Sequence, residues 1–219
     1  MDSLNNKYAI ALHTSTPQLG IAINNYAGSS RDRVWNLGRG LSSQLHTHLQ
    51  EILTPQTWQD LKFIAVAKGP GGFTGTRVGV VTARTIAQQL NIPLYGISNL
   101  AAVAAAHKIE GDEPKAPLRE RLLAVQMDAR REQLFVAIYQ SNSQGLQTYL
   151  ADTLMTQEVW QQTLKDLLSP YQLIVAGDNT AATVTNVLDL AYADWQQGKY
   201  THWSEVVPYY GQHPVTGTK

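Results

Sequence analysis

A glycine-rich segment, residues 68–77 with the sequence Lys-Gly-Pro-Gly-Gly-Phe-Thr-Gly-Thr-Arg, comes nearest to a pattern that could carry chemistry. It follows a short apolar stretch and opens a helical pattern, and the free amide groups at the start of a helix bind anions. It is not a P-loop, because no Gly-Lys-Ser/Thr closes it, and it lacks one glycine of the dinucleotide-binding fingerprint. The candidate anion- or nucleotide-binding residues are Gly71, Gly72, Thr74, Gly75 and Arg77. The alternative is a tight structural turn that lets two backbones approach closely.

Two loops offer further polar groups. Residues 13–16, His-Thr-Ser-Thr, could bind phosphate through their hydroxyls, but no carboxylate lies beside them for Mg²⁺, which prefers oxygen ligands. Residues 128–131, Asp-Ala-Arg-Arg, occupy the corresponding place in the second half of the chain and could hold phosphate or tRNA. A capped hairpin for the first loop, and a solvated turn with local ion pairs for the second, are the simpler interpretations.

Other catalytic and metal-binding patterns are missing from the sequence. His46 and His48 lie two residues apart on an expected helix, so they point to roughly opposite faces and cannot share a metal ion. Three further histidines have no partner at ligand spacing: His107, His202 and His213. The chain has no cysteine, and the nearest match to a nucleophile elbow, residues 96–100, lacks its second glycine. The sequence therefore predicts no metal site and no catalytic residue, and it favours a protein that binds rather than catalyses.

Composition and charge limit the function further. The chain has 219 residues, of which 43% are hydrophobic, so it can bury a substantial core. Its 17 basic residues balance its 17 acidic ones, which argues against a stand-alone nucleic-acid binder because phosphate affinity comes from clustered lysine and arginine. The first seven residues lack the apolar core of a secretion signal, and the longest apolar run, residues 100–106, is too short to span a membrane. We therefore expect a soluble, cytoplasmic protein with no membrane partner.

The elements that must position these residues repeat along the chain. Apolar alternation and helical spacing predict the order strand, strand, strand, helix, strand, helix twice. In the first half we expect strands at 8–12, 18–24, 31–37, 63–67 and 93–97, and helices at 42–53, 76–90 and 99–108. In the second half we expect strands at 122–127, 133–140, 147–155 and 173–176, and helices at 157–168 and 181–191. Ser42 or Ser43 is expected to cap the first helix, and Asn91 the second.

Local similarity between the two halves supports a duplication. Residues 18–23 align with residues 133–138. At the same offset, Leu49 and Leu53 of the first expected helix align with Leu164 and Leu168. Two amphipathic segments can be matched by chance, but the repeated order of elements favours duplication. We predict two similar α/β lobes, with residues 1–109 in the first and 110–194 in a shorter second, joined by a boundary loop at 110–117. The C-terminal segment, about 195–219, is expected to pack back on the first lobe.

Three consecutive stretches, residues 65–79, 82–87 and 92–100, resemble the signature region of the bacterial TsaB family, also called YeaZ. The loop 13–16, the helix around 45–53 and residues 127–131 are similar to the same family in the same order, so the resemblance covers about residues 8–140 well. It implies an α/β fold of two tandem RNase H-like lobes, the fold of the actin, hexokinase and sugar-kinase superfamily.

The resemblance also implies a function in tRNA modification. The family takes part in making threonylcarbamoyladenosine at the tRNA adenosine 3′ of the anticodon, as a non-catalytic scaffold that dimerises with a TsaD-type transferase. A TsaE-type ATPase resets that complex. The resemblance implies tRNA binding only within the complex, no cofactor of the chain's own, and ATP or ADP bound at the complex interface where a nucleotide binds at all. Whether the isolated chain forms a homodimer through the helices that would bind the partner is left open.

By analogy with the family, the partner surface lies on the helices at 42–53 and 76–90. The second helix has apolar or small residues nearly all round, which is typical of a helix buried in a core or an interface. Gly79 and Ala83 lie four residues apart and are small enough for another helix to approach. The predicted partner-binding residues are Leu45, Leu49, Ile52, Leu53, Arg77, Val78, Val81, Thr82 and Thr85. The alternative is a helix enclosed within its own lobe.

The chain departs from the family at three positions and in the length of its second lobe. His13 replaces the usual first-strand aspartate, which argues further against an Mg²⁺–nucleotide site. Gly72 replaces a serine, and Gln212 replaces an arginine near the C-terminus.

Two other functions stay under consideration. One is a nucleotide-dependent phosphotransferase or ATPase, suggested by the superfamily and the glycine-rich loop. The other is a peptidase-like protein, for which the sequence offers neither a metal cluster nor a nucleophile.

Overall fold

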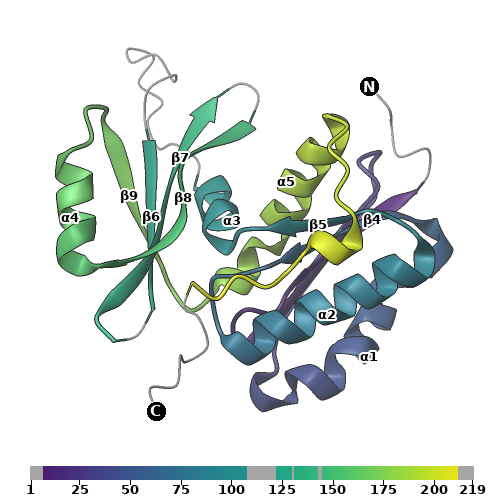
Figure 1. Cartoon of the computed structure of the whole chain (residues 1–219). Helices are drawn as coiled ribbons and strands as arrows, with labels where there is room; N and C mark the ends of the chain where they lie inside the picture. Colours follow the sequence, from purple (N-terminus) through teal and green to yellow (C-terminus); the bar gives the residue numbers. More distant parts are fainter. Residues whose placement is uncertain (1–6, 108–121, 130, 143–144, 212–219) are drawn as a thin grey trace.

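Two mixed sheets, with helices outside and between them, make up the protein (Figure 1). The computed structural model describes residues 7–107, 122–129, 131–142 and 145–211. The predicted boundary loop at 110–117, Gln212 and His213 lie outside this part of the chain. The first sheet has the strand order β3-β2-β1-β4-β5, in which β1 pairs antiparallel with β2 and parallel with β4. Its strands are β1 (Tyr8–His13), β2 (Gln18–Asn24), β3 (Ser30–Asn36), β4 (Leu61–Ala67) and β5 (Leu94–Ile97).

The second sheet repeats the order of the first but stops one strand earlier. Its order is β8-β7-β6-β9, and β6 pairs antiparallel with β7 and parallel with β9. Its strands are β6 (Leu122–Asp128), β7 (Gln133–Asn142), β8 (Gly145–Thr156) and β9 (Tyr171–Ala176). The predicted repeat of strands is therefore confirmed, and the described second sheet has no counterpart of β5.

The helices form three layers around the two sheets. α1 (Leu41–Leu53) and α2 (Phe73–Leu90) cover the outer face of the first sheet, and α4 (Gln157–Lys165) covers part of the outer face of the second. α3 (Asn99–Ala106) and α5 (Val184–Gln196) lie between the sheets and contact each other. α3 follows the first sheet but packs on the second, whereas α5 follows the second sheet but packs on the first. Each lobe thus supplies one helix that packs on the sheet of the other lobe.

Side-chain size explains why α5 lies on the first sheet. In β1, Ile10 and Leu12 face α1 and α2, whereas Ala9 and Ala11 face α5. In β4, Ile64 and Val66 face α1 and α2, whereas Ala65 and Ala67 face α5 beside the larger Phe63. Because alanine leaves room, a helix can approach this face closely and bury its own apolar side chains there. The α5 residues buried on this face are Val184, Val187, Leu188 and Ala191.

The ends of three helices test the predicted boundaries. The predicted serine cap of α1 is wrong: a short 3₁₀ helix, Gly38–Gly40, runs straight into α1, so Gly40 precedes the helix and Ser43 Oγ donates to its carbonyl at 3.0 Å. The predicted cap of α2 is confirmed, with Asn91 left-handed at φ 52°. α2 begins three residues earlier than predicted, at Phe73. The helix expected at 181–191 is a 3₁₀ turn, Thr180–Thr183, followed by α5.

Candidate functional site

The glycine-rich segment packs its backbone against the loop that follows β1. The amide of Gly72 donates to the carbonyl of Ser15 at 2.7 Å, and Thr14 Oγ1 donates to the carbonyl of Gly75 at 2.8 Å. A Cβ atom on Gly75 would lie 2.0 Å from the carbonyl oxygen of Thr14, and one on Gly71 would lie 2.7 Å from the carbonyl oxygen of Ser15. These glycines therefore have a structural role, because only a residue without a side chain allows this approach.

The anion-binding prediction concerns the same segment. Gly72, Thr74 and Arg77 are exposed, whereas Gly71 and Gly75 are partly buried in the contact with the loop after β1. The first amide groups of α2 have no acceptor within the helix, so they and the Arg77 guanidinium stay candidates for holding an anion. Anion or nucleotide binding at these five residues stays a prediction.

His13 ends β1, opposite Gly20 of β2, and is completely buried. Burial lowers the pKa of His13 to about 3, so the imidazole is neutral. Neither ring nitrogen has a hydrogen-bond partner in the described structure, and the buried hydroxyls of Ser15 and Thr180 have none either. A neutral imidazole cannot replace the carboxylate oxygens that Mg²⁺ prefers. Within the described ranges, no three histidine or acidic side chains gather as metal ligands.

The predicted polar turn at 128–131 is described only in part. Its Asp128 ends β6 and is exposed, and Arg131 is exposed with a φ of 53°. Ala129 is buried, and its amide donates to the carbonyl of Gln133 at 3.0 Å across the turn. This geometry matches a solvent-exposed turn between β6 and β7.

A polar cluster joins the two lobes and the C-terminal segment. The Tyr139 hydroxyl donates to the Asp152 carboxylate at 2.8 Å and lies 3.3 Å from Ser98 Oγ, at the start of α3. The Tyr209 hydroxyl donates to the Asp152 carbonyl at 2.8 Å, and the Tyr209 amide donates to the carbonyl of Lys68 at 2.7 Å. Burial raises the pKa of Asp152, although the hydrogen bonds and Lys68 oppose that effect. The cluster thus joins the second lobe, through Tyr209, to the first residue of the glycine-rich segment.

Replacement of Asp152 by asparagine is expected to stabilise the protein at pH 8. The raised pKa of Asp152 means that its contribution to stability is present below pH 4 and is lost as the pH rises through the folded-state pKa. Asparagine keeps an acceptor for Tyr139 without a buried charge. We expect the melting temperature of Asp152→Asn to match wild type near pH 4 and to exceed it by about 2–4 °C at pH 8. The exposed Asp178→Asn is the control. A variant that melts below wild type at pH 8 would show that the hydrogen bonds to the ionised Asp152 carboxylate outweigh the cost of burying its charge.

The outer face of α2 contains the predicted partner residues of that helix. Arg77, Val81 and Thr85 are exposed, and Val78 and Thr82 are partly exposed beside them. Val81 has 52% of its surface exposed, and Phe73, which precedes the predicted start of the helix, has 51%. The opposite face of α2 is buried in the core of its own lobe. The helix is therefore enclosed on one side and open on the other.

The four predicted partner residues of α1 do not form a surface. They are buried against the first sheet, because their helical spacing turns them all to the side that β1, β2 and β4 cover. These residues are Leu45, Leu49, Ile52 and Leu53. The exposed side of α1 is polar and includes His46, Thr47 and Gln50. The exposed large apolar side chains of these two helices, Phe73 and Val81, both belong to α2.

Comparison with known proteins identifies relatives by sequence. The family described as "TsaD: tRNA N6-adenosine threonylcarbamoyltransferase" matches residues 38–194, well over half of the chain. The tRNA threonylcarbamoyladenosine biosynthesis protein TsaB of Bacillus subtilis is 31% identical over 160 residues, which are 72% of this chain and 66% of that protein. The protein of the same name from Escherichia coli is 29% identical over 144 residues, which are 63% of this chain and 57% of that protein. The chain thus spans less than two thirds of the length of these relatives.

Solved structures agree with the fold. A Pseudomonas aeruginosa protein described as similar to peptidase YEAZ superposes with a TM-score of 0.74 at 18% identity, over 94% of this chain and 100% of that one. YeaZ from Pseudomonas aeruginosa superposes with a TM-score of 0.73 at 18% identity, over 93% and 99%. The predicted fold of two RNase H-like lobes is confirmed. Sequence and structure together show that this chain belongs to the TsaB (YeaZ) family.

Proposed function

We propose that this chain is a non-catalytic scaffold subunit that binds a TsaD-type transferase and supports threonylcarbamoylation of tRNA. The relatives from Bacillus subtilis and Escherichia coli are named for the biosynthesis of threonylcarbamoyladenosine, and the matching family is described as the transferase itself. A subunit that resembles its partner in fold can pair with it through equivalent elements. His13, buried and neutral, supports a binding role over chemistry at the end of β1.

The observation that carries this proposal is the open face of α2. Val81 and Phe73 are half exposed there. Next to Val81 on the helix surface are the short side chains of Val78 and Thr85 and the longer side chain of Arg77. Large apolar side chains at half exposure beside short ones let a partner helix approach and bury them. Arg77 lies on this face and would favour a carboxylate on the partner.

The other components follow from the same proposal. A chain with no net charge has little sequence-independent affinity for tRNA, so we infer that tRNA binds the assembled complex. The exposed amide groups at the start of α2 lie next to the proposed partner face, so an ATP or ADP bound by this chain would lie at the interface. A TsaE-type ATPase would then act on the complex and not on this chain alone.

Replacement of Val81 by glutamate tests the partner face. The charge would have to be desolvated in the interface and would draw Arg77, one helical turn before it, away from a carboxylate of the partner, so we expect binding to the TsaD-type protein of the same cell to weaken about thirtyfold or more. Titration calorimetry and light scattering after size exclusion measure this effect. Val159→Glu is a matched control, because Val159 lies on α4 of the other lobe and is also 52% exposed. Equal loss in both variants, or none in either, would contradict this location. Failure of the wild-type chain to co-elute with a folded partner would contradict the scaffold function.

A further inference from the structure

The four edge strands of the two sheets differ in how they are protected. Exposed edges invite pairing with another strand, and proteins protect them with charge, coverage or irregularity. β3 carries Arg31, Asp32 and Arg33, and β8 has register shifts against β7. β5 is covered by the C-terminal segment, where Tyr95 donates to the carbonyl of Lys199 at 2.7 Å. β9, with the sequence Tyr-Gln-Leu-Ile-Val-Ala, has no charged residue, and no described strand pairs with its outer edge.

The outer face of β9 is also uncovered. In the first lobe, α2 packs over β4 and is followed by β5. In the second lobe, only three residues separate β9 from the turn that leads into α5, so no described helix of this lobe corresponds to α2. α4 packs on the neighbouring strands through Trp160 and Leu164. Three apolar side chains of β9 therefore stay exposed: Tyr171 at 41%, Leu173 at 46% and Val175 at 68%.

The same three residues present their backbone groups to the open edge. The amide of Leu122 donates to the carbonyl of Pro170 at 3.0 Å, which sets the phase of the parallel ladder between β6 and β9. Because alternate residues of a strand bond to opposite sides, Gln172 and Ile174 are turned toward β6. Tyr171, Leu173 and Val175 consequently offer their amides and carbonyls outward.

We propose that β9 pairs antiparallel with β9 of a second copy of this chain, with Leu173 opposite Leu173. This register is two-fold symmetric and places Tyr171 opposite Val175 on both sides, an aromatic and β-branched pair that stabilises sheets. It gives every outward amide and carbonyl of the three residues a partner. The strand carries no charge, so two copies meet without repulsion. The two four-stranded sheets become one continuous sheet.

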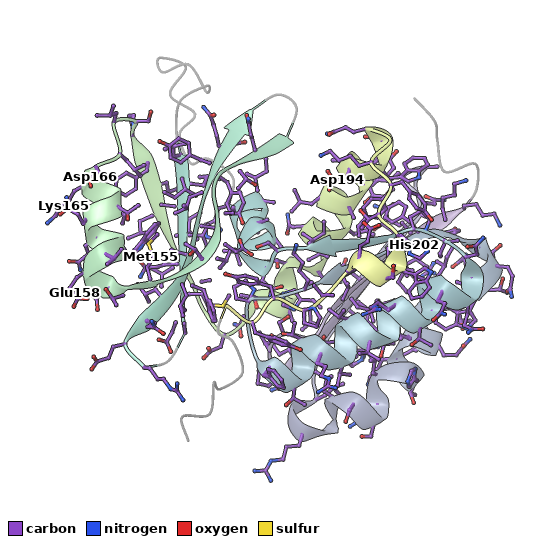
Figure 2. The ribbon with its side chains drawn as sticks, in the orientation of Figure 1. Met155, Glu158, Lys165, Asp166, Asp194 and His202 are labelled. Atoms are coloured by element: carbon purple, nitrogen blue, oxygen red, sulfur yellow. The ribbon has the colours of Figure 1, made fainter. Side chains whose placement is uncertain are left out.

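This surface is separate from the proposed partner face. β9 belongs to the second lobe, whereas α2 covers the outer side of the first, at the opposite side of the molecule (Figure 1). On α4 of the same lobe, Glu158 and Lys165 point away from the sheet, and Asp166 follows at the end of the helix (Figure 2). A dimer through β9 leaves α2 free, and the two interactions can fail independently.

Light scattering after size exclusion, on the full chain without partner, tests the pairing. The contact is small, so we expect the mass to rise from 24.2 kDa toward twice that value over roughly 10–100 µM. Leu173→Lys places two lysines opposite each other and should weaken the dimer about tenfold or more. Val34→Lys is the control, because Val34 is an exposed valine on the edge strand β3. If Leu173→Lys does not fold, Val175→Lys replaces it. The proposal would be overturned by a dimer that survives Leu173→Lys or Val175→Lys, by a dimer that is lost in Val81→Glu, or by a wild-type chain that stays monomeric throughout this range.

A single introduced cysteine tests the register. The chain has no cysteine, so Leu173→Cys can form a disulfide only with a second copy. Opposed residues in a hydrogen-bonded antiparallel pair have Cα atoms about 5.5 Å apart, which suits a disulfide. We expect Leu173→Cys to cross-link under mild oxidation several times faster than Val34→Cys. Equal rates in the two variants would overturn this register.

Discussion

Gly75→Ala is expected to destabilise the protein by about 3 kcal/mol, which lowers the melting temperature by roughly 6–12 °C. Gly75 lies in the first turn of α2, where alanine is intrinsically favoured over glycine by about 1 kcal/mol. The added Cβ, however, would lie 2.0 Å from the carbonyl oxygen of Thr14. That oxygen belongs to the backbone next to β1 and cannot rotate away. The clash outweighs the helix propensity, and the hydrogen bond from Thr14 Oγ1 to the Gly75 carbonyl is strained with it.

Two further glycine variants show whether the clash is the cause. Gly177→Ala is a control, because a Cβ there meets no atom within 4 Å and the residue lies in the loop after β9. Gly79→Ala should lie between the two, since its Cβ would meet the Thr14 hydroxyl at 2.1 Å, an atom that can rotate. Thermal and urea unfolding give the three free energies. A Gly75→Ala variant as stable as Gly177→Ala would show that α2 is not held against the loop after β1.

These contacts show why the sequence alone could not decide whether the glycine-rich segment is an anion-binding loop or a tight structural turn. Its composition fits both an anion loop and a tight turn, and only the position of Thr14, about 60 residues away in the chain, makes Gly75 structurally necessary. The apolar stretch at 8–12 predicted a strand. It could not tell that α5, almost the last element of the chain, covers the alanine side.

The same limit explains the outcome for the predicted partner residues. Leu45 and Leu49 repeat at helical spacing, and that pattern predicts a buried face without saying what buries it. The first sheet buries it, so Leu49→Glu would unfold the lobe and say nothing about a partner. On α2 the pattern was apolar all round, and the side left open could be identified only from the packed structure. Phe73 was missed because the helix begins three residues before the predicted start.

The acid sensitivity of the protein is expected to depend on His13. Its pKa is about 3 in the folded state, below the 6.5 of a free histidine, because burial disfavours the charged ring. The unfolded chain therefore takes up a proton below pH 6.5 that the folded chain does not, and stability falls with falling pH until about pH 3. At pH 4.5 this group alone should cost about 3 kcal/mol relative to pH 7.

His13→Leu isolates this effect. Neither ring nitrogen of His13 has a hydrogen-bond partner in the described structure, so leucine removes no bond and should be at least as stable at pH 7. Desolvation raises the pKa values of the partly buried Asp152 and of Asp189, and these carboxyl groups act in the opposite sense, so the difference between variant and wild type is the relevant quantity. Urea unfolding at pH 7 and pH 4.5 should show that difference growing by about 3 kcal/mol. The exposed His46→Gln should follow wild type.

His13→Asp makes the sign of the effect itself testable. The family's usual aspartate would be completely enclosed here with no described partner for its charge, so its pKa would rise instead of falling. Its contribution to stability would then be lost as the pH increases from 4 to 7, the reverse of wild type. Opposite slopes for histidine and aspartate at one position follow from burial alone. A His13→Asp variant that is stable at pH 7 would instead reveal water or a cation beside the end of β1. The neutral ring would then be a replacement for a bound ion and not a closed core residue.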